Sequence, residues 1–577
     1  MADIDTLIAD FFANLGDVVQ AASNPPDPDV AIAAATLPQT DAGILATHFI
    51  DGTNYFGAIK SEIAALLAGG TDRFFYSNSW SLGTSPTPGV VEIAEGSFTS
   101  AWKDDAAAAA GAEIPFQLED ASGGPFHPFQ DDIKAMSDAG VDVRFLVWAS
   151  PFLVNLEEAG RKIEQYWAIN VHSLRSILDL RQIPSMYNKI VANTLGHTLS
   201  AMHLKTVVCG DSSGFRAYVT GIDFAQSRNS HPIHIDPSLN QGNYWHDVAI
   251  KVEGNAANGV YHCFEQLWNE QVQRSPKTFK AFGDDMKSHV DDTPLVDSRE
   301  TGPVAGGTAH TQILRTLPTM NFSTFATNRA PISCIKRIIS GFKQDKLSFA
   351  KDGVFEFRAA QRKAVNAAAQ YIYIEDQATE NIELASWINA RMKAMPDLKV
   401  ILLHGGDPLD PPSEETPDMM DRLVDGLATP EERIVFVQAP FVIHAKLTII
   451  DDQWASIGSS NCWRRSFYMD GEINVSVLDE ADPPFAAKLR KDLWGEHCRV
   501  MPGPDCDPLL PLNDALGIWR ASWGSPPGGF SLRSDFAIKT VPFVFESSPP
   551  PEAFPLPRPS LSPDQRDMQD GDSRLEY

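Results

Sequence analysis

Two stretches of the chain share one pattern: Met202-His203-Leu204-Lys205-Thr206-Val207-Val208 and Ile443-His444-Ala445-Lys446-Leu447-Thr448-Ile449-Ile450. In each stretch a histidine, and a lysine two positions later, lead into a run of β-branched apolar residues. Alternate residues of a strand point to the same face. We therefore expect each histidine to project beside the lysine of its own stretch, while the intervening residues face a core.

The flanks of the two stretches repeat as well, as alternating helix and strand patterns. Each half shows a helix before a strand, a strand after a turn, a second strand after the His-x-Lys strand, and a closing helix. The first half has these at 55–68, 73–77, 142–148, 216–219 and 260–270, and the second at 357–369, 371–375, 398–403, 454–457 and 485–497. Alternating strands and helices predict a layered α/β fold.

A chain of 577 residues is too long for one ordinary core, so the repeat indicates two lobes. Long additional segments at 83–129 and 151–199 of the first lobe are typical of a lid or a substrate wall. We expect an N-terminal helical extension at 1–44, a first lobe at 45–290, an inter-lobe segment at 291–330, a second lobe at 331–505, and a C-terminal segment at 506–577 with a proline-rich, disordered tail.

The formal net charge is −28 with histidine neutral. Proteins that neutralise many phosphates usually carry a basic surplus, so this balance counts against nucleic acid as a partner and against a broad basic patch for anionic lipid. The N-terminus lacks a basic segment followed by an apolar run, so we expect no Sec signal peptide and no transmembrane segment. We expect a cytoplasmic or peripheral membrane protein, with export that needs no cleaved signal left open.

Two histidines brought face to face can divide the labour of phosphoryl transfer. One neutral imidazole attacks phosphorus, and the other, when protonated, gives its proton to the leaving oxygen. Two lysines then neutralise the charge that develops on the non-bridging oxygens. We assign these roles to His203, His444, Lys205 and Lys446, and we expect no metal and no other cofactor.

Polar residues downstream of each stretch complete the predicted site. In the second half, Gly458 lets the backbone approach an anion, and Ser459 and Asn461 offer hydrogen bonds to it. Asp223 stands at the comparable turn of the first half, so we place it with the phosphate-binding residues. Asp247 and Glu472 each precede an apolar strand, where a carboxylate can hold the far nitrogen of a histidine and fix its tautomer.

Together these residues resemble the phospholipase D superfamily, which is marked by a duplicated His-x-Lys-x4-Asp motif. The second copy is complete, with Asp451 as its aspartate, whereas the first has Gly210 at that position and Asp211 one residue late. Three further segments resemble the lipid-cleaving branch, at 311–316, 371–377 and 489–497. In this family the aspartate is thought to be structural, so the shift affects the local turn more than the reaction.

The resemblance implies two pseudo-twofold α/β/α lobes that share one active site. His203 would be the nucleophile and His444 the proton donor, although the near symmetry permits the reverse. The substrate would be a phospholipid at a membrane or micelle surface, cleaved to phosphatidic acid by water or transphosphatidylated by an alcohol. Candidate anchors in the bilayer are aromatic: Phe126, Phe129, Trp519, Trp523 and Phe530.

Other functions stay open at this point. A nuclease and a phosphatidyltransferase of the cardiolipin-synthase kind share the twin motifs. A non-catalytic binding or scaffold member is the alternative of another class, and the shifted Asp211 is its only support. The proline-rich tail is a candidate ligand for a partner protein.

Overall fold

The computed structural model describes most of two lobes. The described residues are 3–14, 38–83, 129–149, 176–196, 200–225, 245–274, 299–318, 345–351, 353–405, 415–439 and 442–497, with positions 17, 173, 174, 228, 230, 294, 295 and 519 and the short strands at 278–281, 284–287 and 539–540.

The first lobe alternates strands and helices as the sequence predicts. Its elements are β1 (Gln39–Ile50), α3 (Gly52–Ala68), β2 (Phe74–Ser79), α5 (Phe129–Asp138), β3 (Asp142–Trp148), β4 (Ile190–Asn193), β5 (Thr206–Asp211), β6 (Gly214–Thr220), β7 (Val248–Glu253) and α8 (Ala256–Gln273). A single 3-10 turn, η1 (Pro184–Met186), precedes β4.

The second lobe repeats this order. Its elements are β10 (Ala309–Leu317), β11 (Val354–Phe355), α11 (Glu356–Ala367), β12 (Tyr371–Asp376), α12 (Ile382–Ala394), β13 (Lys399–Gly405), α13 (Glu415–Val424), η3 (Pro430–Glu432), β14 (Ile434–Ala439), β15 (Lys446–Ile450), β16 (Trp454–Gly458), α14 (Arg464–Tyr468), β17 (Glu472–Asp479) and α15 (Phe485–His497). Outside this repeat lie α1 (Ile4–Phe11), the hairpin β8 (Thr278–Ala281) with β9 (Asp284–Lys287), and β18 (Lys539–Thr540).

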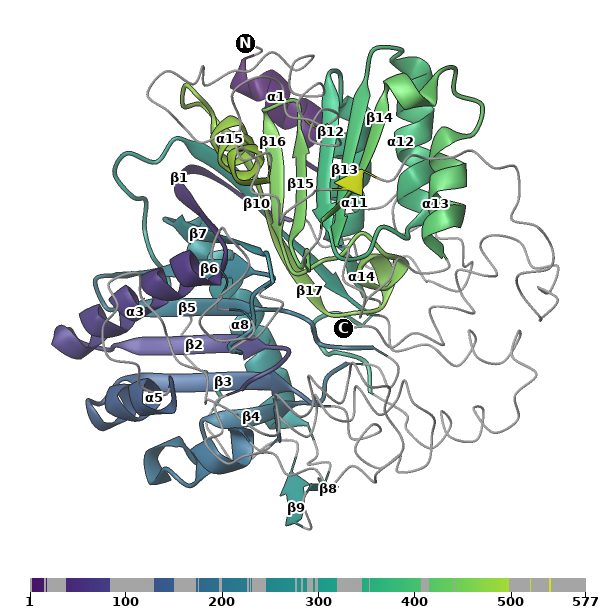
Figure 1. The fold of residues 1–577 in the computed structure, drawn as a ribbon. Coiled ribbons are helices and arrows are strands. Elements are labelled where there is room, and N and C mark those ends of the chain that lie inside the picture. The colour runs from purple at the N-terminus through teal and green to yellow at the C-terminus, as the bar shows by residue number, and fades with distance from the viewer. Residues whose placement is uncertain are drawn as a thin grey trace.

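One 16-stranded mixed sheet runs through both lobes (Figure 1). From the centre outward, the first lobe has the order β1-β7-β6-β5-β2-β3-β4 and the second has β10-β17-β16-β15-β12-β13-β14. The outer three strands of each half are parallel and the others antiparallel. β1 pairs antiparallel with β10 at the centre, with Gln39 opposite Ile313. The strand order is therefore that of a pseudo-twofold α/β fold.

Helices cover both faces of the sheet because each sheet face is apolar. A cluster under α3 and α5 includes Phe56 and Phe145, and a cluster under α11 to α13 includes Phe357 and Met392. A third cluster takes residues from both lobes, among them Trp268 of α8 and Trp494 of α15. The lobes thus share both a sheet and a core.

Several predicted boundaries differ from the structure. β1 already begins at Gln39, within the segment expected to be a helical extension, because this strand is needed to pair with β10. The inter-lobe segment likewise contributes β10, a central strand of the sheet. No described helix is long and apolar enough to cross a membrane.

Two of the candidate bilayer anchors are wrong. Phe129 is fully buried beside Phe224, and Trp519 is fully buried against Trp494. Both rings are therefore part of the protein core. Phe126, Trp523, Phe530 and the proline-rich tail lie outside the described residues.

Candidate active site

The two His-x-Lys segments meet across the boundary between the lobes. Each forms a short parallel bridge with the other lobe: Met202 pairs with Gly471, and His246 pairs with Ile443. The backbone N–H of His203 donates to the carbonyl of Gly471 at 2.7 Å, and that of His444 donates to the carbonyl of His246 at 2.7 Å. Each histidine is therefore held by backbone from the opposite lobe.

The bridges place each predicted acid on the histidine of the other lobe. Nδ1 of His203 lies 3.0 Å from Oε2 of Glu472, and Nδ1 of His444 lies 2.6 Å from Oδ2 of Asp247. All four side chains are buried. The structure therefore brings the predicted histidines and acids together, as two crossed pairs.

The tautomer of His203 follows from its second neighbour. Its Nδ1 also lies 3.0 Å from the carbonyl oxygen of Ser459, which can only accept a hydrogen bond. Nδ1 must therefore carry the proton, so the lone pair of the neutral ring is on Nε2. Within the part of the chain that the structure describes, Nε2 of His203 and Nε2 of His444 are both buried without a hydrogen-bond partner. These are the atoms that can react with a substrate.

Burial and the adjacent cations set the charge state of the empty site. Burial first, and then the lysines, hold the pKa of His203 and of His444 well below the usual range. Burial raises the pKa of Asp247 and of Glu472 to about 7. Both imidazoles are therefore neutral near pH 7, and an arriving anion would raise their pKa again.

The two lysines are buried beside the histidines, each with acidic side chains nearby. Nζ of Lys205 lies 3.6 Å from Oδ2 of Asp223 and donates to the carbonyl of His203 at 3.1 Å. Nζ of Lys446 donates to the carbonyl of His444 at 2.5 Å. Burial lowers the pKa of Lys446 to about 8, against the opposing charges of Asp247 and Asp376.

Asp223 does not fit the phosphate-binding role assigned from the sequence. Its Oδ1 accepts from the backbone N–H groups of Trp80 and Ser81 at 3.1 and 3.0 Å, and its other oxygen faces Lys205. A carboxylate so placed would repel a phosphate, whereas it can orient an ammonium group. Asp376, which the sequence reasoning missed, faces Lys446 in the second lobe.

Gly458 and Ser459 also have roles other than direct phosphate binding. A Cβ at Gly458 would lie 2.3 Å from the carbonyl oxygen of Ile473, so the close strand pairing requires the glycine. The hydroxyl of Ser459 donates to Glu472 at 2.5 Å, and that of Ser466, which the sequence reasoning missed, donates to the same carboxylate at 2.6 Å. Both serines therefore hold Glu472.

The phosphate-binding role of Asn461 stays a prediction. Its side chain is fully buried, and among the described residues neither its amide nitrogen nor its oxygen has a hydrogen-bond partner. An unpaired buried amide is costly, and a bound polar group can satisfy it. Asn461 therefore fits a substrate-binding residue.

The two motif aspartates differ in structure. Asp451 is buried and accepts from the backbone N–H groups of Ala369, Gln370 and Tyr371 at 2.6, 2.8 and 2.7 Å. Asp211 instead accepts from the backbone N–H of Ser213 at 2.8 Å within its own exposed turn. The complete motif thus fixes the entry to β12, whereas the shifted aspartate closes a local turn.

Aromatic rings flank both histidines, which the sequence reasoning did not anticipate. Trp80 meets His203 edge to face at 5.6 Å between centroids, and Trp245 lies 4.9 Å from His444. The guanidinium of buried Arg228 lies 3.2 Å from the centroid of Trp245. Both tryptophans belong to the first lobe, one before and one after its His-x-Lys segment, and no repeat in the sequence marked them.

Further histidines and acids gather beside the site. His246, Glu375 and His497 are close enough for their ring nitrogens and carboxylate oxygens to surround a divalent cation, as are Asp51, His246 and Glu496. Both ring nitrogens of His246 already face carboxylates at 3.0–3.1 Å. These ion pairs are the contacts that hold the cluster together.

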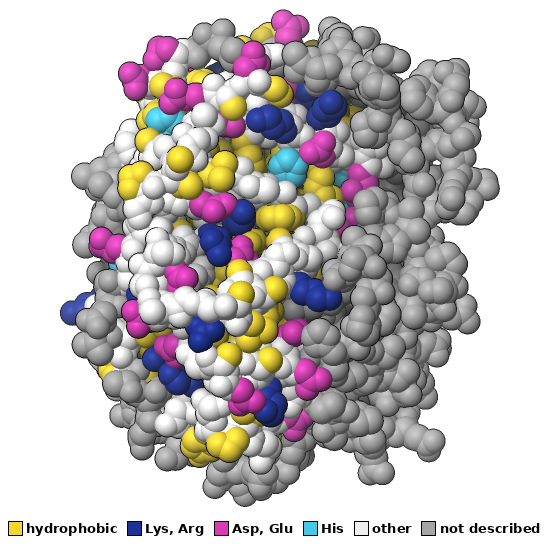
Figure 2. Space-filling model, turned by 90° about the vertical axis from the view of Figure 1, so that its left-hand side faces the viewer, with side chains coloured by type: hydrophobic (Ala, Val, Ile, Leu, Met, Phe, Trp, Pro, Cys, Tyr) yellow, Lys and Arg dark blue, Asp and Glu magenta, His cyan; other side chains and the backbone are white. Residues whose placement is uncertain are grey.

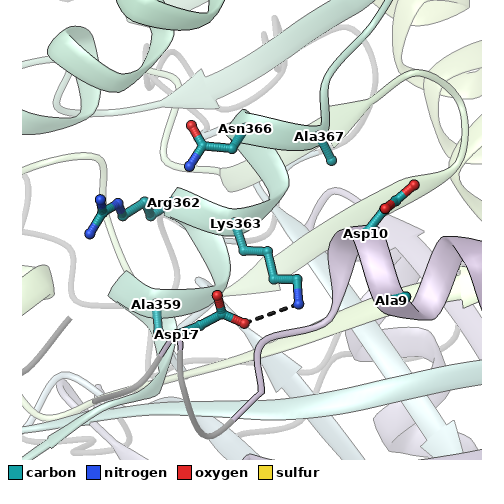
Figure 3. Close-up of a pocket in the computed structure, with 8 residues that line it drawn as sticks. All are labelled: Ala9, Asp10, Asp17, Ala359, Arg362, Lys363, Asn366 and Ala367. Atoms are coloured by element: carbon teal, nitrogen blue, oxygen red, sulfur yellow. Dashed lines mark hydrogen bonds and ion pairs between the residues drawn. The ribbon is translucent and has the colours of Figure 1, made fainter. Parts of the chain in front are cut away.

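A separate hollow of about 260 Å³ lies between α1 and α11 (Figure 3). Asp17 pairs with Lys363 across it at 3.0 Å, and Arg362 and Asn366 point to its rim. None of the residues of the candidate active site lines it.

Comparisons with known proteins bear on the same part of the chain. Residues 370–495 match the family described as "Cardiolipin synthase, PLD-like domain". Phospholipase D beta 1 of Arabidopsis thaliana is 26% identical over 292 residues, which are 42% of this chain and 25% of that protein. The match thus spans about a quarter of the length of this relative.

Two solved structures were also matched over much of this chain, at low identity. Phosphatidylserine synthase of Haemophilus influenzae Rd KW20 is 11% identical, with a TM-score of 0.45 over 78% of this chain and 87% of that one. Polyphosphate kinase from Porphyromonas gingivalis is also 11% identical, with a TM-score of 0.39 over 82% of this chain and 55% of that one.

The duplicated motif, the matching family and the plant relative define the class: these are proteins that handle phosphodiesters. Residues 370–495 match the PLD-like domain of that family, and the plant relative and the duplicated motif support the phospholipase D superfamily.

Proposed function

We propose that this chain is a phospholipase D-type phosphodiesterase that acts on glycerophospholipids through a covalent phosphohistidine. The observation that carries the proposal is the pair of crossed histidine–carboxylate contacts, each leaving a buried Nε2 without a partner beside a buried lysine.

The first step is an attack on phosphorus by Nε2 of His203. Its Nδ1–H is held by Glu472 and by the carbonyl of Ser459, so the lone pair is directed away from both. Binding of the phosphate anion raises the pKa of His444, so that its ring is protonated at both nitrogens in the complex. The P–O bond to the head-group alcohol breaks, and its oxygen takes the proton from Nε2 of His444, which leaves that ring neutral. Lys205 and Lys446 stabilise the negative charge on the non-bridging oxygens.

The second step reverses the proton transfer. His444, now neutral, takes a proton from water, whose oxygen attacks phosphorus and breaks the P–N bond to His203. The products are phosphatidic acid and regenerated imidazole. If an alcohol takes the place of water, the product is a new phosphodiester, which is transphosphatidylation.

The choice of a lipid over a nucleic acid has two supports. Net charge is −28, and on the described part of the face in Figure 2 acidic and basic side chains are interspersed without a continuous basic band. Trp80 and Trp245 add apolar surface at the histidines, which suits a substrate with an apolar part.

A phosphatidyltransferase is the second candidate, because the matching family is described by cardiolipin synthase. It would use the same two steps, with a lipid alcohol as the acceptor in the second. A nuclease and a non-catalytic scaffold are the remaining alternatives.

The experiment is product analysis by mass spectrometry, with mixed phospholipid vesicles as substrate, with and without ethanol, in EDTA. Without ethanol we expect phosphatidic acid. With ethanol we also expect a phosphatidylethanol. His203→Gln and His444→Gln should abolish both products, whereas the matched control His310→Gln, at a histidine paired with Glu480 away from the site, should keep them. Turnover that persists in either active-site variant would refute the proposal.

A further inference from the structure

A second buried cluster of charges lies next to the candidate active site, centred on His246. Its Nδ1 is 3.1 Å from Oδ1 of Asp51 and 3.1 Å from Oε1 of Glu496, and its Nε2 is 3.0 Å from Oε2 of Glu375. The other oxygen of Glu375 meets Nε2 of His497 at 3.1 Å. These five side chains are at most 8% exposed.

The cluster joins the two lobes. Asp51 follows β1 and His246 precedes β7 in the first lobe, while Glu375 belongs to β12 and Glu496 to α15 in the second. Three carboxylates face one imidazole ring, so their charges favour its protonated form. The charged ring has an acceptor on both nitrogens, and removing either lobe would leave buried charges uncompensated.

The backbone connects this cluster to the active-site pair. The N–H of Asp51 donates to the carbonyl of Asp247 at 2.8 Å, and the N–H of His246 donates to the carbonyl of Val442 at 2.9 Å. Consecutive residues of an extended segment point to opposite sides. The His246 ring therefore faces the charge cluster, while the next side chain, Asp247, faces His444.

The other crossing is held in a different way. There Gly471 donates to the carbonyl of Ala201 at 2.8 Å, and a Cβ on Gly471 would lie only 2.7 Å from the sulfur of Met202. Asp470, which pairs with Arg465 at 2.9 Å, also accepts from the backbone N–H of Ala201 at 2.8 Å. The bridge that serves His203 is thus held by close packing and by its own buried ion pair, and the two crossings share no side chain.

We propose that the cluster of Asp51, His246, Glu375, Glu496 and His497 is a positioning device for His444: it fixes the His246–Ile443 bridge and so aims Asp247 at Nδ1 of His444, while His203 is positioned independently by the Met202–Gly471 bridge. Its expected effect on turnover rests on the proposed function, but its effect on the His444 ring does not.

The direct test is proton NMR of the ring N–H groups in the full chain. A strongly hydrogen-bonded Nδ1–H of His444, identified by its loss in Asp247→Asn, should give a downfield line, as should that of His203, identified in Glu472→Gln. The test variant is Glu375→Gln, which removes one charge of the cluster and keeps its shape. The matched control is Glu356→Gln, at an equally buried carboxylate that pairs with Arg315 at 2.9 Å.

We expect Glu375→Gln to shift or broaden the His444 line and to leave the His203 line in place, whereas Glu356→Gln changes neither. On phospholipid vesicles kcat should fall about 10- to 100-fold with little change in KM, because the loss is one of orientation and the lysines are untouched. If Glu375→Gln does not fold, Glu496→Gln takes its place. This variant is milder, because Asp51 still faces the same nitrogen of the His246 ring.

Two results would overturn the inference. One is an unchanged His444 line in a folded cluster variant, and the other is an equal change in the lines of both histidines. If the wild-type protein has no turnover but the selective change of the His444 line is seen, the proposed function fails and the positioning role stands.

Discussion

The two acids that hold the histidines are predicted to differ in importance, although they occupy equivalent places. Nδ1 of His203 has two acceptors, Glu472 and the carbonyl of Ser459, whereas Nδ1 of His444 has Asp247 alone among the described residues. In Glu472→Gln the backbone carbonyl still fixes the tautomer. In Asp247→Asn no described acceptor fixes the tautomer of His444, because the amide can present its NH2 group to the ring and favour the wrong tautomer.

The magnitudes follow from what each variant removes. Glu472→Gln takes away the charge of one hydrogen bond, worth about 1.5–3 kcal/mol, so kcat should fall roughly 10- to 100-fold. Asp247→Asn takes away both the charge and the tautomer of His444, and the comparable change in a serine protease triad costs about 10⁴-fold. We therefore expect a gap of at least about tenfold between the two variants.

The assay is steady-state hydrolysis of a phospholipid in mixed micelles, with thermal unfolding to show that both variants fold. A second substrate with a nitrophenol leaving group separates the roles, since this alcohol needs little protonation. If His444 is the proton donor, Asp247→Asn should recover much of its deficit on the nitrophenyl ester. Equal losses for the two variants, or a larger loss in Glu472→Gln, would refute the reasoning.

Three further predictions concern stability and binding. Burial raises the pKa of Asp247 to about 7. Between about pH 4 and pH 7 this carboxyl is therefore protonated in the folded protein and ionised in the unfolded chain. This contribution to stability is present below pH 4 and is lost as the pH rises toward 7, so Asp247→Asn should raise the midpoint of thermal unfolding at pH 8 and change it little at pH 4. Asp451→Ala should cost about 3 kcal/mol in urea unfolding because three backbone N–H groups lose their acceptor, whereas Asp211→Ala in its exposed turn should cost under about 0.5 kcal/mol. Asn461→Ala should lower kcat/KM about 10²-fold without lowering the unfolding midpoint, because its amide has no partner to lose within the described chain.

The sequence was sufficient for the residues that belong to a periodic pattern. His203 and His444 stood out because each occupies the same position before an apolar strand, and the alternation of helices and strands in each half followed from the repeat. Asp247 and Glu472 were found in the same way, by their parallel placement before β7 and β17. Local periodicity is the strongest signal in a sequence, so these predictions were the most direct.

Features that depend on contacts between distant segments were beyond this reasoning. Which acid serves which histidine depends on contacts between residues 269 and 197 positions apart, and no local pattern encodes that choice. The hydroxyl of Ser459 was assigned to phosphate because its acceptor, Glu472, lies 13 residues further along the chain and meets it only where β17 folds back beside β16. Asp223 was assigned to phosphate by analogy of position, although its charge argues for a lysine partner.

The crossed pairs make the activity a property of the joined lobes. Each lobe contains one histidine and its lysine, but the carboxylate that holds this histidine comes from the other lobe. Neither lobe alone therefore contains a complete histidine–carboxylate pair. The pairing of β1 with β10 and the core shared by α8 and α15 therefore have a catalytic consequence, because they fix the lobes at the separation that both pairs require. A shift between the lobes would lengthen both contacts at once. The ion pairs of His246 at one crossing resist such a shift because it would separate buried charges, and at the other the buried Asp470, which pairs with Arg465, would lose the backbone N–H of Ala201. Each histidine is thus held across the lobes by its own set of contacts, so a substitution in one set can disturb one ring and leave the other in place.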